Sequence, residues 1–229
     1  MKFKSWKGMG VALCLVVLAG CGGPKGTHWS SVATAAQVAV DTPLAARYET
    51  FHDIRDKTQN WWYLRRKNRI EKRIPELGLA WVWSRHGDRL EMQQVLLREK
   101  RVIDYTTADL KITRGYPAWD TLTHMLDSHL LSRLKPSAKT RVMGRPAIWY
   151  KGMIGSTTLK ILWLEDLQLP AEIVRSNHGQ TSRVHLTALY PEDQAPLPPL
   201  QLDEFEHMDF ADLGDNEADP VWGLFAHPH

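Results

Sequence analysis

Cysteine is almost absent from this chain, which has two in 229 residues, Cys14 and Cys21. Both lie close to the start of the sequence, so the rest of the chain has no thiol for a disulfide or for a cysteine metal site. Its stability must therefore come from a packed core, and a chain of this length is long enough to form one as a single domain.

The chain also lacks a long hydrophobic run and the common catalytic motifs. Its main apolar stretch, Met9–Ala19, is shorter than the about 20 residues that a membrane-spanning helix needs. There is no Gly-x-Ser-x-Gly, no His-Glu-x-x-His and no phosphate-binding loop. The histidines, His124 and His129 among them, are not spaced with carboxylates as metal ligands are. We therefore expect no enzyme activity, no metal and no cofactor.

The N-terminus has the pattern of an exported protein. Three lysines precede the short apolar run, and Leu18-Ala19-Gly20-Cys21 resembles the lipobox of bacterial lipoproteins. The resemblance implies cleavage before Cys21, diacylglycerol on its sulfur and stable anchoring in a membrane. Gly22 after the cysteine implies sorting to the outer membrane of a Gram-negative host, with the protein facing the periplasm. An ordinary signal peptide with a chance cysteine is the alternative.

Charged residues are balanced in number but unevenly distributed. The chain has 29 Lys and Arg against 26 Asp and Glu, and removal of residues 1–20 leaves 26 of each sign. A balanced domain has no electrostatic basis for binding nucleic acid. Lysine and arginine are absent after Arg183, whereas ten acidic residues follow it. This acidic end could be solvated, could lie back across the basic body of the chain, or could contact another protein.

The first element of the expected domain is a helix over residues 41–56. Pro43 suits the first turn of a helix, and Leu44, Tyr48 and Phe51 fall near helical spacing.

Strands are expected over most of the remaining domain. Alternation of apolar and polar residues over 60–106 predicts antiparallel strands that are covered on one side only. An apolar stripe predicts a second helix over 117–134. Residues 138–191 predict four further strands, with hairpin turns at Gly155-Ser156 and Asn177-His178-Gly179.

This order of elements resembles the LolA/LolB-like group of outer-membrane lipoprotein-sorting proteins and the similar domain of the periplasmic sensor RseB. The group's pattern of glycine, aromatic strand, turn, acidic strand end and Leu-Pro falls on Gly144, Tyr150, Trp163, Glu165, Asp166, Leu169 and Pro170. Over about 47–134 only the order of elements matches. The resemblance implies an α+β fold, a curved antiparallel half-barrel covered by two or three helices on its concave side, which can receive acyl chains.

These patterns divide the chain into four expected regions. They are a lipoprotein signal peptide (1–20), a lipidated tether (21–31), a LolA/LolB-like domain (32–190) and a Pro-rich and acidic tail (191–229). In the tail, 191–200 is expected to be extended and the acidic part after it poorly ordered.

Tryptophan is abundant, with ten in the chain. Trp81 and Trp83 are two apart, so on a strand they share one face. Such rings either form an ordinary core or line a groove that admits an apolar ligand, with the helix over 117–134 as its lid. The second alternative predicts a ligand-binding set of Trp62, Trp81, Trp83, Tyr150, Leu159, Ile161 and Trp163.

Two functions are compatible with these expectations. The first is an outer-membrane-anchored periplasmic lipoprotein that binds an acyl chain or another apolar ligand in envelope or lipoprotein maintenance. The second is a non-catalytic envelope scaffold or sensor that binds a protein partner through its basic body or its acidic tail. In both, the lipid on Cys21 attaches the protein to the membrane.

Overall fold

A computed structural model describes residues 43–53, 57–113, 116–216, 219 and 221. Cys21 and the predicted signal peptide and tether lie outside these residues, so lipidation and export remain predictions. Within the described part, no helix is both long and apolar enough to cross a membrane.

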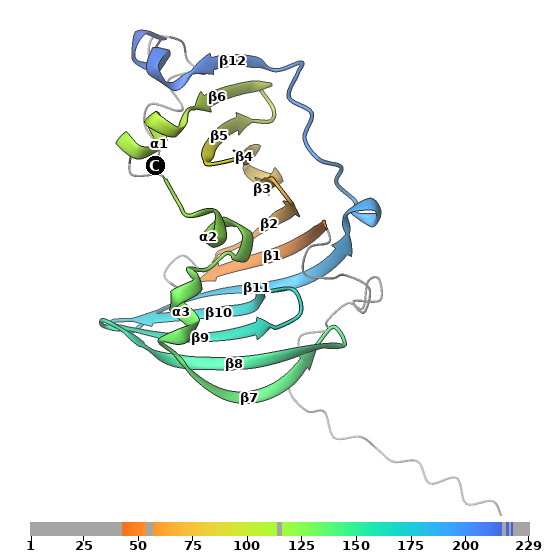
Figure 1. The fold of residues 1–229 in the computed structure, drawn as a ribbon, viewed down its shortest axis with the longest axis vertical. Coiled ribbons are helices and arrows are strands. Elements are labelled where there is room, and N and C mark those ends of the chain that lie inside the picture. Colours follow the sequence, from red (N-terminus) through yellow and green to blue (C-terminus); the bar gives the residue numbers. More distant parts are fainter. Residues whose placement is uncertain (1–42, 54–56, 114–115, 217–218, 220, 222–229) are drawn as a thin grey trace, which may run out of the picture.

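In the part of the chain that the structure describes, twelve strands form one sheet (Figure 1). Their order is β12-β6-β5-β4-β3-β2-β1-β11-β10-β9-β8-β7, and all neighbours are antiparallel except β12 and β6. In chain order the strands are β1 (Leu44–His52), β2 (Lys57–Arg66), β3 (Arg69–Ile74), β4 (Leu79–His86), β5 (Arg89–Leu96), β6 (Arg101–Tyr105), β7 (Lys135–Val142), β8 (Arg145–Ile154), β9 (Thr157–Leu164), β10 (Leu169–Asn177), β11 (Gln180–Pro191) and β12 (Glu206–Asp209).

Two meanders and β12 make up the sheet. The hairpins of β2 to β6 follow the prediction, whereas β1 was predicted as a helix and the second meander has five strands where four were predicted over 138–191. The first runs from β1 to β6 and the second from β7 to β11, and the pairing of β1 with β11 joins them. The predicted turn at Gly155 is confirmed, with a φ of 59°. His178 and Gly179 have φ values of 46° and 80°, as a two-residue hairpin turn requires.

The predicted α+β half-barrel covered by helices is wrong. Only three short α-helices occur in the described residues: α1 (Thr107–Ile112), α2 (Trp119–His124) and α3 (Ser128–Ser132). They lie along one face of the curved sheet without covering it (Figure 1). The protein is instead dominated by its sheet. We call the face that α2 and α3 contact the inner face, and the opposite one the outer face.

The helix predicted over 41–56 is also wrong, because its centre is β1. Leu44, Ala46 and Tyr48 are fully buried, and β1 hydrogen-bonds along both edges, to β2 and to β11. Pro43 precedes the strand, where a residue without an N–H is tolerated. Leu44 and Tyr48 share a face in a strand as they do in a helix, so their spacing did not discriminate between the two.

The helix predicted over 117–134 is interrupted. Met125 ends α2 in the left-handed region, with a φ of 59°, and Asp127 then caps α3 by accepting a hydrogen bond from the His129 N–H. The interruption lets Leu126 turn into a buried cluster on the inner face while Leu122 packs beside another.

The acidic C-terminal segment, residues 192–216, is packed against the sheet. Leu202 is buried in a cluster on the outer face with Val82 and Val95, and β12 extends the sheet beside β6. A 3-10 helix, η4 (Phe210–Asn216), follows, and two shorter ones, η2 (Pro75–Leu77) and η3 (Glu192–Gln194), occur earlier. The prediction that the chain after residue 200 is poorly ordered is therefore wrong for 201–216.

Ion pairs hold the C-terminal segment in place. Glu192 pairs with Arg66, and Glu206 lies 3.1 Å from Arg101. Asp219 also pairs with Arg101, at 3.1 Å. Of the three alternatives for the acidic end of the chain, these contacts favour the second, in which it lies across the basic body.

Candidate functional site

The inner face carries most of the aromatic residues predicted to bind a ligand. Trp81 and Trp83 share this face as predicted, opposite Lys72 and Ile70 of β3. Trp83 packs against the same buried clusters as Trp119 of α2. The 117–134 region was predicted to cover the tryptophans, and at Trp83 it does so through the short helix α2.

Lys72 of β3 lies over two inner-face indole rings and was not among the predicted site residues. Its ammonium lies 5.0 Å from the ring centre of Trp61 and 5.6 Å from that of Trp81. Burial lowers the pKa of Lys72, and the two indole faces offset part of the lost hydration of its charge. The sequence held a signal for this position. Lys72 is two residues from the inward-facing Ile70 on β3, so strand alternation puts it on the inner face as well.

Trp62 lies apart from the other predicted ligand residues. It is on the outer face, where its ring centre is 5.9 Å from that of Tyr190. Its neighbour Trp61 takes the inner face and stacks on Tyr48 at 4.8 Å. Period-two alternation therefore separates Trp62 from Trp81 and Trp83.

The remaining predicted residues lie on the inner face of the second meander. Leu159, Ile161 and Trp163 belong to one buried cluster, against which Tyr150 packs. This cluster is distinct from the one beside Trp81 and Trp83. The predicted set therefore falls into two inner-face groups, and Trp62 belongs to neither.

One cavity includes two of the predicted residues, Tyr150 and Trp163. It has a volume of about 330 Å³ and opens where the chain breaks between α2 and α3, so we call it the helix-break pocket. Its lining residues are Asp120, His124, Leu126, Asp127, Leu131, Tyr150, Trp163, Glu165 and Gln168.

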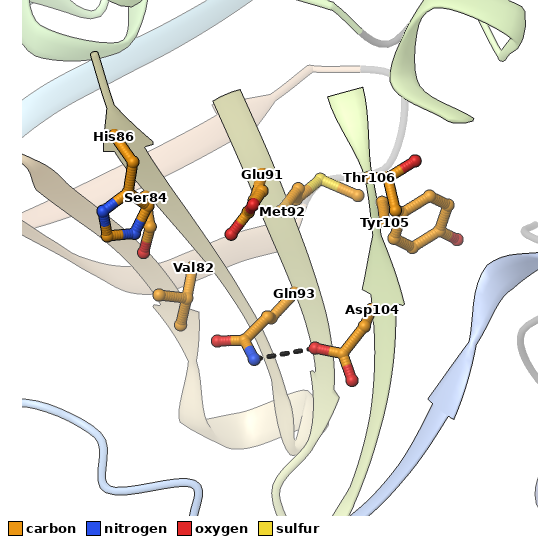
Figure 2. A pocket seen from close by; sticks show the side chains of 9 residues that line it. All are labelled: Val82, Ser84, His86, Glu91, Met92, Gln93, Asp104, Tyr105 and Thr106. Atoms are coloured by element: carbon orange, nitrogen blue, oxygen red, sulfur yellow. Dashed lines mark hydrogen bonds between the residues drawn. The ribbon is translucent and has the colours of Figure 1, made fainter. Parts of the chain in front are cut away.

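A second cavity, the outer pocket, lies on β4, β5 and β6 (Figure 2). It has a volume of about 290 Å³, and its polar lining includes His86, Glu91 and Asp104. Gln93 donates a hydrogen bond to Asp104 Oδ1 at 2.8 Å, and His207 Nδ1 contacts Asp104 Oδ2 at 2.6 Å. Both oxygens of Asp104 are thus engaged in structural contacts, which makes this carboxylate a poor general base.

No metal centre is formed in the described part of the chain. There, no group of three or more His, Asp, Glu or Cys side chains is arranged to hold an ion. The absence of an enzyme activity and of a cofactor remains a prediction.

His207 links β12 to the rest of the protein through both ring nitrogens. Nδ1 lies 2.6 Å from Asp104 Oδ2, and Nε2 lies 3.1 Å from the carbonyl oxygen of Leu202. Burial lowers the pKa of His207, but the hydrogen bonds to Asp104 and Leu202 and the charges of Asp104 and Asp203 outweigh it, so the pKa is raised overall. Two acceptors favour the doubly protonated ring.

We expect the C-terminal segment to loosen as the pH rises. A histidine whose pKa is raised on folding contributes its stability fully below the unfolded pKa, about 6.5, and loses it as the pH rises through the folded pKa. Because the ring is 37% exposed, screening limits the effect to about 1 kcal/mol or less. The rate at which a protease cleaves within residues 192–216, followed between pH 6 and 9, measures this loosening. His207→Gln should remove the pH dependence, and an unchanged dependence would contradict the assignment.

A basic row crosses the outer face at the far end of the sheet from β12. Lys135 of β7 is directly opposite Lys151 of β8, which is directly opposite Lys160 of β9. All three side chains are exposed, and Met153 beside them is 66% exposed. In the described residues none of the three lysines has an ion-pair partner within 4 Å. Like charges opposite one another destabilise a sheet, so this row costs the fold stability.

Strand β7 is an edge strand of the sheet. It pairs with β8 alone, and seven of its eight side chains are exposed. Lys135, Pro136 and Lys139 are of the kinds that protect an edge from pairing with another strand. The charged outer face, rather than the backbone edge, is therefore the surface here that is open to a partner.

Comparisons with known proteins assign no family. No family and no curated protein matches the sequence. A structure of PNGF-II is similar with a TM-score of 0.44 and 10% identity over 78% of this chain and 33% of that one. The MucA/MucB complex of Pseudomonas aeruginosa is similar with a TM-score of 0.39 and 13% identity, over 71% of this chain and 54% of that one. An uncharacterized conserved protein from Thermus thermophilus is similar with a TM-score of 0.34 and 13% identity, over 74% of this chain and 91% of that one.

The chain therefore spans about a third of the PNGF-II chain and about half of the MucB complex chain that it matches. All three TM-scores lie below 0.5, so these likenesses carry neither a family nor a function to this protein. The resemblance of the sequence to the LolA/LolB-like group stays a prediction.

Proposed function

We propose that this protein is a non-catalytic binding protein of the cell envelope that holds an acidic partner protein on the outer face of β7, β8 and β9. The observation that carries the proposal is the row of Lys135, Lys151 and Lys160. Three opposed cations without counter-charges destabilise the free protein, and an acidic surface laid across them would relieve that repulsion.

The protein's own acidic end does not neutralise this row in the described residues. Its carboxylates pair with Arg66, Lys100 and Arg101, which lie in or beside the first meander. Strands β12 and β7 are at opposite ends of the sheet order. The row is thus available to a second molecule. The exposed Met153 next to it supplies an apolar contact of the kind enriched at interfaces.

A location at a membrane surface facing the periplasm is a further part of the proposal, and the lipobox-like Leu18-Ala19-Gly20-Cys21 supports it. The acyl-chain alternative has less support from the geometry. Neither the helix-break pocket nor the outer pocket is lined by Trp81, Trp83, Leu159 or Ile161.

Charge reversal of the row should abolish capture of the partner. In the triple variant Lys135→Glu, Lys151→Glu, Lys160→Glu, three favourable charge contacts become repulsive. We therefore expect the affinity of the protein for its acidic partner to fall on the order of a hundredfold at low salt. Photo-crosslinking from position 153 in whole cells, followed by mass spectrometry, identifies the partner, and titration of the purified protein with that partner at low salt measures the affinity.

The matched control reverses three exposed cations elsewhere, as Lys57→Glu, Lys67→Glu, Arg89→Glu. It should leave the crosslink intact. Equal losses in the two triple variants would show that net charge matters and the row does not. No protein crosslink from position 153 in the unmodified chain would overturn the proposal.

A further inference from the structure

The helix-break pocket combines an aromatic wall with an acidic rim. Trp163 and Leu126 are buried at its base, and Tyr150 and Leu131 are half-buried beside them. Three carboxylates line it, and no lysine or arginine does.

His124 also lines the pocket, with Nε2 3.0 Å from Asp120 Oδ1 and Nδ1 3.0 Å from the carbonyl oxygen of Gln168, so Asp120 already faces a side chain that can carry positive charge. Asp127 and Glu165 have no such partner in the described ranges, and an apolar lining with these two carboxylates is suited to an amphipathic cation.

The three carboxylates differ in how far they are already engaged. Asp120 Oδ1 lies 3.0 Å from His124 Nε2, and Asp127 caps α3. Glu165 lines the pocket with no hydrogen bond or ion pair to its carboxylate among the described residues. The neighbouring Asp166 is paired with Arg145. Glu165 is therefore the carboxylate that is available to a ligand.

We propose that the helix-break pocket binds a small organic cation, an ammonium group carried on a short apolar body. The body packs against Trp163, Tyr150 and Leu126, and the ammonium lies at the rim beside Glu165. The rings add attraction for the cation through their faces. A fatty-acid carboxylate entering the same pocket meets the carboxylates of Asp127 and Glu165 and no lysine or arginine, so this site selects against an acyl ligand.

Isothermal titration of the protein with hexylammonium, hexanol and hexanoate tests the ligand class without any variant. The three probes share one apolar chain and differ in charge. We expect hexylammonium to bind about tenfold more tightly than hexanol, and hexanoate to bind most weakly. Equal binding of all three, stronger binding of hexanoate, or no heat from hexylammonium would each overturn the proposal.

Glu165→Gln locates the site, because it keeps the side-chain shape and removes the charge. It should bring the affinity for hexylammonium down to about that for hexanol. Glu91→Gln, in the outer pocket, is the matched control and should leave the titration unchanged. Hexylammonium should also shift the Trp163 indole N–H resonance. A cation that binds equally to both variants, or that leaves this resonance unmoved, binds elsewhere, and the assignment to this pocket fails.

Discussion

Replacing Glu71 by alanine should destabilise the protein by about 3–5 kcal/mol, which is the usual cost of leaving one partner of a buried ion pair alone. Glu71 is 2% exposed on the outer face of β3. It accepts hydrogen bonds from Arg69 Nε at 2.8 Å and from Arg73 Nε at 3.0 Å. Burial lowers the pKa of Arg73 and the charge of Glu71 opposes that shift, so the guanidinium depends on this carboxylate. Urea denaturation measures the loss.

The same substitution should release the C-terminal segment. Glu71 Oε2 also accepts from the backbone N–H of Leu200 at 3.3 Å, and Arg73 donates to the carbonyl of Pro198 at 2.6 Å. Cleavage of residues 195–205 by a protease should therefore accelerate in Glu71→Ala.

Two controls separate charge from packing at Glu71. Glu172→Ala removes a partly exposed pair with Arg183 on the same face and should cost no more than about 1 kcal/mol. The double variant Glu71→Met, Arg73→Met replaces the buried pair by apolar groups of similar size and should recover part of the stability. The recovery is partial because Arg69 and the Leu200 N–H still lose their acceptor. A Glu71→Ala loss no larger than that of Glu172→Ala would show that the buried pair is not needed.

The hairpins were predictable because their signals are local. Alternation and turn chemistry at Gly155 and at His178-Gly179 specify neighbouring strands that pair with each other. The joining of the two meanders by β1 was not predictable from local signals. Tyr48 of β1 lies opposite Leu186 of β11, and no local pattern reveals a pairing across so long a separation.

The interrupted helix was harder to predict for a different reason. Residues 117–134 carry an apolar stripe at helical spacing, which favours one continuous helix. Tertiary contacts of Leu126 on the inner face outweigh that preference and are compatible with the left-handed backbone at Met125. The helix-break pocket follows from this interruption, so it could not be anticipated from the spacing. Helix α1 had a usable local signal, the capping box of Thr106 and Asp109, which the analysis missed.

Strand alternation correctly predicted that Trp81 and Trp83 lie on one face of the sheet. That face is the inner one, whereas Trp62 lies on the other side. Lys72 between two indoles was missed because a lysine within a strand is usually solvated. The role of these residues in binding stays a prediction.

Replacing Tyr48 by alanine should cost about 3–5 kcal/mol, the usual range for removing a buried aromatic ring. Tyr48 has no exposed surface and stacks on Trp61. Its hydroxyl donates to the carbonyl of Pro170 at 2.9 Å, which ties β1 to the start of β10. Tyr48→Phe keeps the ring and leaves that buried carbonyl unpaired, so it should cost about 1–3 kcal/mol. Thermal or urea unfolding measures both values.

Phe51→Ala is the control that distinguishes the strand from the helix expected over 41–56. In a helix, positions 48 and 51 are neighbours on one face, so their substitutions should cost similar amounts. In β1 they lie on opposite faces, and Phe51 is 37% exposed. Its replacement should therefore change stability by less than about 1 kcal/mol. Equal and large losses at both positions would contradict the strand and with it the joining of the two meanders.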